Sequence, residues 1–367
     1  MFITQKTSMN ERGVDKMQKE YQAIIVGSGP AGAACAKALK NEGVEVLVIE
    51  KDKLPRNKTC SGVLFDQTQV LLDQYFGGLP PGDVYCAPKI IKAENILEWN
   101  REKGFCTYVW ELPKDGQSFP QDFYNTWRSK FDYWLLNESG AAYIDDCKFN
   151  NYSIENGKVK VEVSRNDKEN IDLYCSYLIG ADGGGSRLRP LLDPSFMKIE
   201  QSFTVYQAYY RFSDMGSLED DHWYVFFEPQ IGEAISAVSR KDDFLTLCVG
   251  GFKGRSLKKS MEDFKNLLAE NFQVALKGME RDEGCVMKMA PPFLGKDNII
   301  LTGEAAGMLY LNGEGISTAI DSGYRAGKAV AQGIKKGGNV LDIYGKEIEG
   351  ILNHMKLCME KIHFFAV

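Results

Sequence analysis

The sequence has little of what several classes of protein require. It holds only three histidines, and its nine cysteines form no Cys-x-x-Cys pair, so we expect no bound metal and mostly reduced thiols. No apolar run approaches the roughly 20 residues that span a bilayer. Acidic residues outnumber basic ones, 50 to 44, for a net charge of −6, which argues against nucleic acid as a partner. Because the N-terminal segment also lacks the apolar core of a secretory signal, we expect a cytoplasmic protein.

The chain does have a globular composition and a clear opening pattern. It has 367 residues, 44% hydrophobic and 26% charged, which is enough for two subdomains. A short apolar run at 21–26 predicts a buried strand, small residues at helical spacing predict a helix over 30–41, and 44–50 predicts a second strand. The first 50 residues therefore predict a β-α-β unit.

The turn between the first strand and helix, G-S-G-P-A-G at 27–32, has the spacing of a dinucleotide-binding loop. Gly27 permits the tight turn, Gly29 lets a pyrophosphate approach the backbone, and Gly32 lets helix and strand pack closely. The helix N-terminus supplies N–H groups and partial positive charge for the phosphates. Glu50, 23 positions after Gly27, stands where an acidic residue takes ribose hydroxyls. We therefore predict a bound adenine dinucleotide.

Two later segments indicate which dinucleotide. The stretch Y-L-I-G-A-D-G-G-G-S-R-L-R at 177–189 resembles the G-A-D-G-x-x-S-x-[VL]-R segment of FAD-dependent hydroxylases and reductases of the glutathione-reductase-like flavoprotein class. The stretch N-I-I-L-T-G-E-A-A-G at 298–307 resembles the G-D-A-A-G of that class. The resemblance implies a noncovalent FAD contacted by Asp182 and, at the ribityl hydroxyls, by Glu304.

Within that class the sequence resembles the geranylgeranyl reductase family, whose members saturate isolated double bonds of polyprenyl chains with reduced FAD. R-N-K-T-C-S-G at 56–62 is similar to the family's R-x-K-x-C-G-G turn, and R-S-K-F-D-Y-W-L at 128–135 to its R-x-x-F-D-x-W-L helix. W-Y-V-F-F-E-P at 223–229 is loosely similar to Y-x-W-x-F-P, and L-N-G-E-G-I at 311–316 to T-G-E-G-I.

This resemblance implies roles for individual residues. Cys60 is expected near the isoalloxazine ring and Tyr224 in the substrate pocket, and both are candidate catalytic residues. Arg128 is expected to bond the phosphate or ribityl region. The loop before residue 316 is expected to face the flavin N1/C2 edge, where a helix N-terminus stabilises negative charge. The predicted cofactor-binding residues are Gly27, Gly29, Ala31, Gly32, Glu50, Lys51, Cys60, Ser61, Arg128, Asp182, Gly303, Glu304, Gly313, Gly315 and Ile316.

Several positions leave alternatives open. Glu304 replaces the family's Asp and is one methylene longer, Ser61 replaces a Gly, and Tyr310 stands where the family usually has a proline. We expect Tyr310 to reshape the flavin pocket, so substrate and oxygen behaviour are not carried over from the family. Arg56 and Lys58 either face Cys60 and depress the pKa of its thiol or are solvated loop charges.

The remaining pattern predicts an α/β fold: a Rossmann-like FAD-binding domain with an inserted, mainly antiparallel β-sheet substrate domain and C-terminal helices. Helices are predicted at 66–74, 123–139, 316–335 and about 340–362, and strands within 152–178, 202–252 and from 297. The expected parts are a flexible segment 1–20, a discontinuous FAD-binding domain of 21–85, 120–195 and 285–335, a substrate-binding domain of 86–119 and 196–284, and a C-terminal helix at 336–367.

Three functions follow from these features. The first is a reductase that delivers hydride from reduced FAD to a carbon–carbon double bond of an apolar, prenyl-like substrate. The second is an FAD-dependent monooxygenase of an aromatic or other apolar small molecule, and the third a non-catalytic FAD-binding electron-transfer protein. A halogenase is disfavoured because no W-x-W-x-I-P segment is found. Since no second Gly-x-Gly-x-x-Gly exists, the external donor is NAD(P)H bound transiently or a protein; transient contact with a membrane surface and the oligomeric state stay open.

Overall fold

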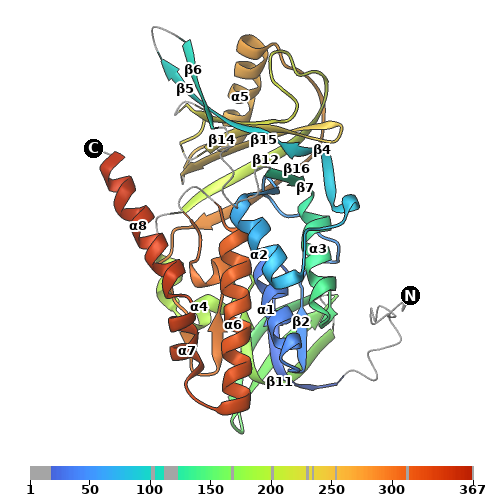
Figure 1. The fold of residues 1–367 in the computed structure, drawn as a ribbon, viewed down its shortest axis with the longest axis vertical. Helices are drawn as coiled ribbons and strands as arrows, with labels where there is room; N and C mark the ends of the chain where they lie inside the picture. The colour runs from blue at the N-terminus through green and yellow to red at the C-terminus, as the bar shows by residue number, and fades with distance from the viewer. Residues whose placement is uncertain are drawn as a thin grey trace.

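The computed structural model describes residues 18–100, 104–110, 123–166, 169–199, 202–228, 231–233, 235–252, 254–310 and 314–365. Figure 1 shows two parts stacked along the long axis of the molecule, one of helices on a sheet and the other of a second sheet with one helix. The predicted α/β class is confirmed.

The first part is built on a mainly parallel sheet, as a dinucleotide-binding fold requires. Its strands are β1 (Glu20–Val26), β2 (Val46–Ile49), β8 (Ala142–Ile144), β11 (Glu169–Gly180), β17 (Gly295–Lys296) and β18 (Ile299–Leu301). In the order β17-β18-β11-β1-β2-β8, every pair from β18 to β8 is parallel. The first half of β11 also pairs with the hairpin of β9 (Cys147–Glu155) and β10 (Lys158–Arg165).

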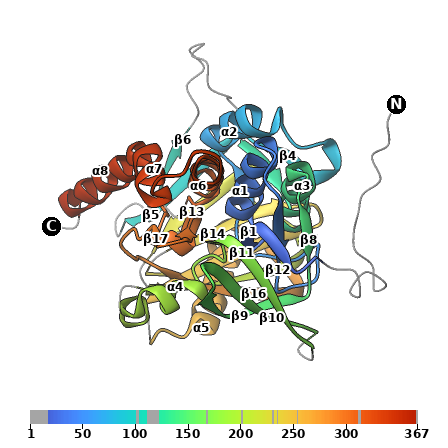
Figure 2. The same cartoon turned by 90° about the horizontal axis from the view of Figure 1, so that it is seen from below.

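Helices cover one face of this sheet (Figure 2). They are α1 (Pro30–Asn41), α2 (Asp66–Phe76), α3 (Arg128–Ser139) and α6 (Ile316–Lys336). Helices α1 and α6 can approach closely because α6 carries glycines at the contact. A Cβ on Gly323 would lie 2.2 Å from the carbonyl oxygen of Ala31, and one on Gly327 would lie 2.5 Å from that of Cys35. The small residues of α6 therefore hold the first and last FAD-type segments of the chain together.

A small sheet joins the two parts. It consists of β3 (Val63–Leu64), β7 (Phe123–Thr126) and β4 (Tyr85–Ile91), and the 3-10 turn η2 (Gly82–Val84) leads into β4. The predicted helix over 123–139 is wrong for its first residues. Residues 123–126 pair with both β3 and β4, and this pairing in the sheet outweighs the helical pattern that follows them.

The second part is a sheet of order β16-β12-β15-β14-β13-β5-β6 packed on one helix. Its elements are β5 (Ala93–Asn100), β6 (Gly104–Trp110), β12 (Ser202–Asp214), β13 (His222–Phe227), β14 (Ile235–Lys241), β15 (Phe244–Phe252), α5 (Leu257–Phe272) and β16 (Ala275–Lys288). Only the β13–β5 pair is parallel among the described pairs of this sheet, so the predicted mainly antiparallel sheet is confirmed. Where the domain limits fall stays a prediction.

The remaining elements are short turns and the C-terminal helices. They are α4 (Leu188–Leu192), η3 (Pro194–Lys198), η4 (Gly303–Ala306), α7 (Val340–Glu347) and α8 (Glu349–Phe365). The single helix predicted at about 340–362 is wrong. It breaks at Ile348, whose fully buried side chain belongs to the core of the first part and turns the chain there. Among the described residues, no helix combines the length and apolar character needed to cross a membrane.

Candidate cofactor site and an adjoining hollow

The glycines at 27–32 have the conformations that a pyrophosphate loop needs. Gly27 has φ +102°, and a Cβ there would lie 2.5 Å from the carbonyl oxygen of Ala181; a Cβ on Gly32 would lie 1.9 Å from that of Gly27. Gly29 is different, because the nearest atom to its Cβ position is the tip of Arg56, at 3.4 Å. No side chain caps the start of α1 at Gly29, so backbone and space are available to a phosphate.

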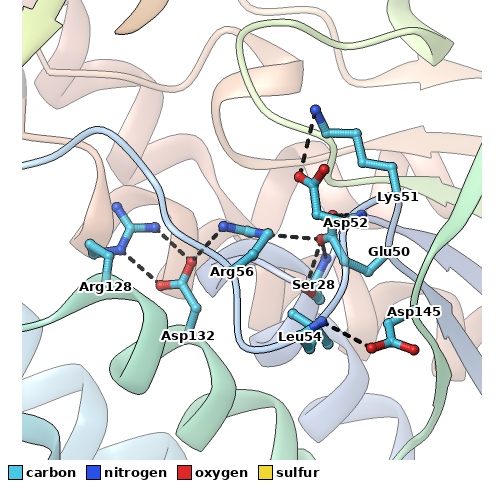
Figure 3. Close-up of polar contacts among 9 residues, drawn as sticks. All are labelled: Ser28, Glu50, Lys51, Asp52, Leu54, Arg56, Arg128, Asp132 and Asp145. Atoms are coloured by element: carbon cyan, nitrogen blue, oxygen red, sulfur yellow. Dashed lines mark hydrogen bonds and ion pairs between the residues drawn. The ribbon is translucent and has the colours of Figure 1, made fainter. Parts of the chain in front are cut away.

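Hydrogen bonds and one ion pair fix the carboxylate of Glu50 just after the end of β2. Its Oε2 accepts hydrogen bonds from the Ser28 N–H (3.0 Å) and Oγ (2.7 Å) and forms an ion pair with Arg56 Nε at 3.1 Å, while its Oε1 accepts from the Asp52 N–H at 3.1 Å (Figure 3). Burial by itself would raise the pKa of Glu50. The guanidinium of Arg56 and the hydrogen bonds outweigh it, so the pKa of Glu50 is lowered and the carboxylate is ionised at neutral pH.

Arg56 also takes part in a buried series of ion pairs that the sequence analysis did not predict. Its Nη1 lies 3.3 Å from Oδ2 of Asp132, which also receives Arg128 through Nε–Oδ1 (2.8 Å) and Nη2–Oδ2 (2.9 Å). Figure 3 shows the chain running from Glu50 through Arg56 and Asp132 to Arg128. Arg56 is thus not a solvated loop charge. The signal was present in the R-x-x-F-D helix, whose Asp faces the same way as its Arg one turn earlier.

Lys51 is not brought into this chain. Its side chain is 69% exposed and pairs with Asp52 at 3.7 Å, away from Glu50 (Figure 3). The predicted role of Lys51 in binding the cofactor therefore has no support in the geometry.

Asp182 belongs to the glycine turn after β11, and the carboxylate of Glu304 lies against the same turn. Asp182 Oδ2 accepts the Arg187 N–H at 2.7 Å, whereas its buried Oδ1 has no hydrogen-bond partner among the described residues. Burial raises the pKa of Asp182, and hydrogen bonds to its carboxylate oppose the rise. The longer side chain of Glu304 reaches over this turn, because a Cβ on Gly184 would lie 2.3 Å from Glu304 Oε1. A glycine opposite Glu304 thus provides the space that the extra methylene needs.

The third FAD-type segment, 298–307, packs closely against the first, 27–32. A Cβ on Gly303 (φ +59°) would lie 2.8 Å from the Cβ of Ala31, and the Gly303 N–H donates to Ser322 Oγ at 3.1 Å. Arg189, at the end of the second segment, donates to the carbonyl oxygen of Ala305 at 3.2 Å. Three segments far apart in the sequence therefore converge, as predicted.

The start of α6 differs from the expectation. Gly313 lies outside the described residues. Gly315 precedes the helix and Ile316 is buried beside α1 and α3, but the Ser317 N–H donates to the Glu314 carboxylate at 2.9 Å. Burial raises the pKa of Glu314, and the hydrogen bonds from Ser317 and Ile316 oppose the rise. The helix start is thus already capped by a side chain, so the predicted stabilisation of flavin charge by free N–H groups here is not supported.

The loop at 60–62 explains why one glycine of the family pattern is dispensable. Gly62 has φ +69°, and a Cβ there would lie 2.3 Å from the carbonyl oxygen of Thr126, whereas Ser61 has no positive φ and its Oγ accepts the Val63 N–H at 3.4 Å. Cys60 is half-buried; its Sγ accepts the Gly62 N–H at 3.4 Å, and its carbonyl oxygen accepts from Gln207 Nε2 at 3.3 Å. The loop therefore faces the second sheet.

Tyr224 lies elsewhere. Its ring belongs to the apolar core between the second sheet and α5, and its hydroxyl accepts the Glu219 N–H at 2.7 Å. Side chains alternate between the faces of a strand, so Tyr224 points away from the face that meets Cys60. The structure does not bring these two predicted catalytic residues together.

A small hollow lies between the 57–60 loop, the start of α3 and the inner face of the second sheet, which sequence reasoning did not assemble. Its lining residues are Asn57, Lys58, Cys60, Thr126, Trp127, Arg128, Ser129, Tyr209, Lys241 and Arg281. The Tyr209 hydroxyl donates to Glu283 Oε1 at 2.6 Å, and burial followed by this contact raises the pKa of Tyr209. The alternation along β12 could have placed Tyr209 on the inner face; nothing in the sequence pointed to Lys241 or Arg281.

The residues present fit an FAD. The uncapped start of α1, the ionised Glu50 and the unpartnered Oδ1 of Asp182 offer the contacts that pyrophosphate and hydroxyl groups require. In the described part of the chain, no three His, Cys, Asp or Glu side chains gather as a metal site would need. The fold and site define an FAD-binding flavoprotein of the α/β class.

Comparison with known proteins agrees with that class. The family model described as "FAD binding domain" matches residues 20–76 and 136–355, and the chain belongs to this family. The chain is 25% identical over 334 residues to digeranylgeranylglycerophospholipid reductase 2 of Methanosphaera stadtmanae, covering 87% of this chain and 79% of the relative. It is 28% identical over 349 residues to protein FixC of Salmonella typhi, covering 86% and 78%.

Solved structures share the fold. A geranylgeranyl bacteriochlorophyll reductase-like protein of Thermoplasma acidophilum has a TM-score of 0.76 at 19% identity, covering 90% of this chain and 84% of that one. A flavin-dependent brominase has a TM-score of 0.68 at 17% identity, covering 89% and 83%. The predicted resemblance to geranylgeranyl reductases is confirmed, and the chain is an FAD-dependent oxidoreductase by family.

Proposed function

We propose that this protein is a reductase that saturates a carbon–carbon double bond of an apolar, prenyl-like substrate. The observation that carries the proposal is that Cys60 and Tyr209 line the same hollow, between the FAD-binding part and the second sheet. Two proton-bearing groups there suit a reaction that adds hydride to one carbon and a proton to its neighbour. The 25% identity to a reductase of geranylgeranyl lipids supports the same assignment.

In the proposed reaction the flavin is the hydride source, and Tyr209 and Cys60 are the candidate proton donors. Reduced FAD, when bound, supplies the hydride, and the other alkene carbon must then receive a proton. Tyr209 carries its proton at neutral pH, like any tyrosine, and burial followed by the contact with Glu283 raises its pKa further. Cys60 is half-buried in the same hollow and is the second candidate donor. Hydride and proton together convert the alkene to an alkane, and two electrons are returned by an external donor.

The identity of that donor is part of the proposal. We infer NAD(P)H bound transiently or a protein donor, because the chain has a single Gly-x-Gly-x-x-Gly turn. A cytoplasmic location and the absence of nucleic acid from its partners stay predictions of the same sequence reading.

The deciding experiment reduces the FAD-loaded protein without oxygen and mixes it with a panel of prenyl compounds. We expect reoxidation of the flavin and a product heavier by two hydrogens, detected by mass spectrometry. The same reaction under labelled dioxygen tests the monooxygenase alternative, which the family likeness to hydroxylases and the brominase fold keep open. Label in the product would replace our proposal by that alternative, and no turnover with any compound would favour an electron-transfer protein.

A further inference from the structure

The hydroxyl of Tyr209 is surrounded by three polar side chains, which restricts what it can do as a proton donor. Its proton points to Glu283 Oε1 at 2.6 Å, and its oxygen accepts a hydrogen bond from Gln207 Nε2. The guanidinium of Arg281 lies 4.0 Å from the ring centroid and shares the same hydroxyl. A hydroxyl has one proton and two lone pairs, so these neighbours occupy all of its directions. In this arrangement the Tyr209 proton faces Glu283 and not the hollow.

The protonation state of Glu283 controls where that proton points. A carboxylate can only accept, so it keeps the Tyr209 proton between the two side chains. A protonated Glu283 can instead donate to the Tyr209 oxygen, and the Tyr209 proton can then turn toward the hollow that Cys60 also lines. Glu283 is half-buried on β16, whereas Tyr209 is 3% exposed. The carboxyl group is therefore the member of the pair that protons from solvent reach first.

Gln207 can release the Tyr209 oxygen without losing its own hydrogen bonds. Its Nε2 carries two protons but has three acceptors, which are the Tyr209 hydroxyl, Glu283 Oε1 at 3.3 Å and the carbonyl oxygen of Cys60 at 3.3 Å. Gln207 is 1% exposed, so water does not replace these partners. When the bond to Tyr209 is given up, both N–H groups still have an acceptor in Glu283 and Cys60. The rotation of the Tyr209 proton therefore leaves no donor of Gln207 buried and unsatisfied.

We propose that Glu283 is a positioning residue that passes protons from solvent to Tyr209, so that Tyr209 protonates the substrate only while Glu283 is itself protonated. The proposal rests on the proposed reductase function for the identity of the acceptor carbon. The Tyr209 O–H bond breaks as a C–H bond forms at the alkene carbon next to the one that receives hydride. The Glu283 proton moves to the Tyr209 oxygen, and the resulting carboxylate takes a proton from water. The alkene thus gains one proton and one hydride, whose two electrons come from reduced FAD, and Tyr209 ends in its starting form.

Several charged and titratable groups face Glu283 besides Tyr209. They are Arg281 and Cys285 on its own strand, and Lys58, Cys60 and Glu304, which act on Cys285 together with Glu283. The cations among them favour the carboxylate form of Glu283, and the carboxylate of Glu304 favours the protonated form. Because more than one of these groups can respond to pH, each measurement compares the wild type with Glu283→Gln, whose side chain does not titrate.

Asp282 offers a matched control on the same strand. Its Oδ2 accepts the Tyr206 hydroxyl at 2.8 Å, which is the same carboxylate–tyrosine contact. Tyr206 packs against the apolar core between the second sheet and α5, so this pair lies on the opposite face of the sheet from the hollow. Asp282→Asn and Glu283→Gln therefore make the same chemical change beside a tyrosine, and only Glu283→Gln makes it beside the hollow.

The first test observes the Tyr209 hydroxyl directly and needs no turnover. FAD-loaded protein carrying carbon-13 at the tyrosine Cζ is titrated from about pH 8 to about pH 4 by NMR, and the Tyr209 signal is identified by its loss in Tyr209→Phe. We expect the Tyr209 signal to move with pH in the wild type and in Asp282→Asn, and to stay fixed in Glu283→Gln. A Tyr209 signal that moves equally in the wild type and Glu283→Gln, or that moves in neither, would overturn the proposal.

The second test measures flavin reoxidation by a prenyl compound in a single turnover without oxygen. In the wild type the rate should fall with rising pH, by up to about tenfold per pH unit, as Glu283 loses its proton. Glu283→Gln should be slower than the wild type at about pH 5, by about tenfold or more, because an amide does not pass a proton on. Its rate should also be constant within about twofold up to about pH 8, whereas Asp282→Asn should keep the wild-type profile. A slower Glu283→Gln that retains the wild-type pH profile would assign Glu283 a packing role and overturn the proposal.

The two tests separate this proposal from the proposed function. If no prenyl compound reoxidises the flavin, the reductase assignment fails, and the NMR titration still decides whether Glu283 controls the Tyr209 proton. If turnover occurs while the Tyr209 signal ignores Glu283, only the proton transfer through Glu283 fails. Glu283→Asp keeps a carboxyl group and should keep a pH-dependent Tyr209 signal, which provides a second variant if Glu283→Gln does not fold. Circular dichroism and FAD content establish folding in each variant.

Discussion

Single glycines differ in what they do, and Gly29 is the one that can be tested without unfolding the protein. A Cβ on Gly29 would lie 3.4 Å from the flexible tip of Arg56, whereas a Cβ on Gly32 would lie 1.9 Å from a backbone oxygen. We predict that Gly29→Val folds but loses FAD, because its side chain takes the space of the pyrophosphate. Flavin absorbance of the purified protein and circular dichroism measure the two properties. Gly278→Val, at a position with no atom within 4 Å, is the control and should keep its FAD.

The contribution of Glu50 to the free energy of unfolding should depend on pH in the acid range. Its pKa lies below the ordinary value of about 4.5, so its ionised form contributes stability above that pH, and the contribution is lost as pH falls through the lowered pKa. We predict that Glu50→Gln lowers the free energy of unfolding by about 1 to 2 kcal/mol at pH 7. The difference from wild type should shrink below about pH 4.5, as urea titrations would show. A difference that stays constant from pH 7 to pH 3, or one equal to that of the exposed Glu45→Gln, would contradict this role.

Cys60 can be separated from an ordinary buried cysteine by kinetics. If its thiol donates the proton or shapes the pocket, Cys60→Ala should keep FAD and slow flavin reoxidation by substrate about tenfold or more. Stopped-flow absorbance without oxygen measures that rate. Cys106→Ala, a half-buried cysteine on an edge strand, is the matched control. Equal substrate-dependent rates in Cys60→Ala and wild type would return Cys60 to a packing role and leave Tyr209 as the proton donor.

At the scale of elements, α3 contributes one buried carboxylate, which pairs with two arginines. Asp132 is 1% exposed and holds both Arg56, from the loop after β2, and Arg128 from its own helix. We predict that Asp132→Asn destabilises the fold by about 3 kcal/mol, since it leaves two arginines without their counter-charge, and weakens FAD binding as Arg56 moves. Chemical unfolding and FAD titration measure the two effects. Glu138→Gln on the exposed face of the same helix should change neither.

At the scale of the molecule, FAD should act as a structural tie between distant segments. The turns after β1, β11 and β18 converge on one site although they are spread over most of the chain. We predict that removing FAD lowers the melting temperature and that saturating it to about 100 times its Kd restores about 2.7 kcal/mol. Calorimetry of the apo and loaded forms tests this. Identical melting temperatures would mean that the segments are held without the cofactor.

The helix predicted over 30–41 matches α1, since its small residues, Pro30 at the first turn and Gly43 after its end act locally. Residues 123–126 were predicted as helix and are strand, because their partners in β3 and β4 lie 32 to 62 positions earlier in the chain. Tyr310, which was expected to reshape the flavin pocket, packs its ring edge-on against His354 of α8, with the ring centroids 4.9 Å apart.

The sequence by itself determined the cofactor class of this protein. Each FAD-type segment is a strand followed by a glycine turn, and the φ angles and close approaches that require glycine act within a few residues. Only the tertiary structure decided which charged and proton-bearing side chains share a site. Arg56, Asp132 and Arg128 meet across two segments, and Lys58, Lys241 and Arg281 meet across three. Such meetings depend on how sheets and loops pack, which hydrophobic periodicity and residue spacing do not encode.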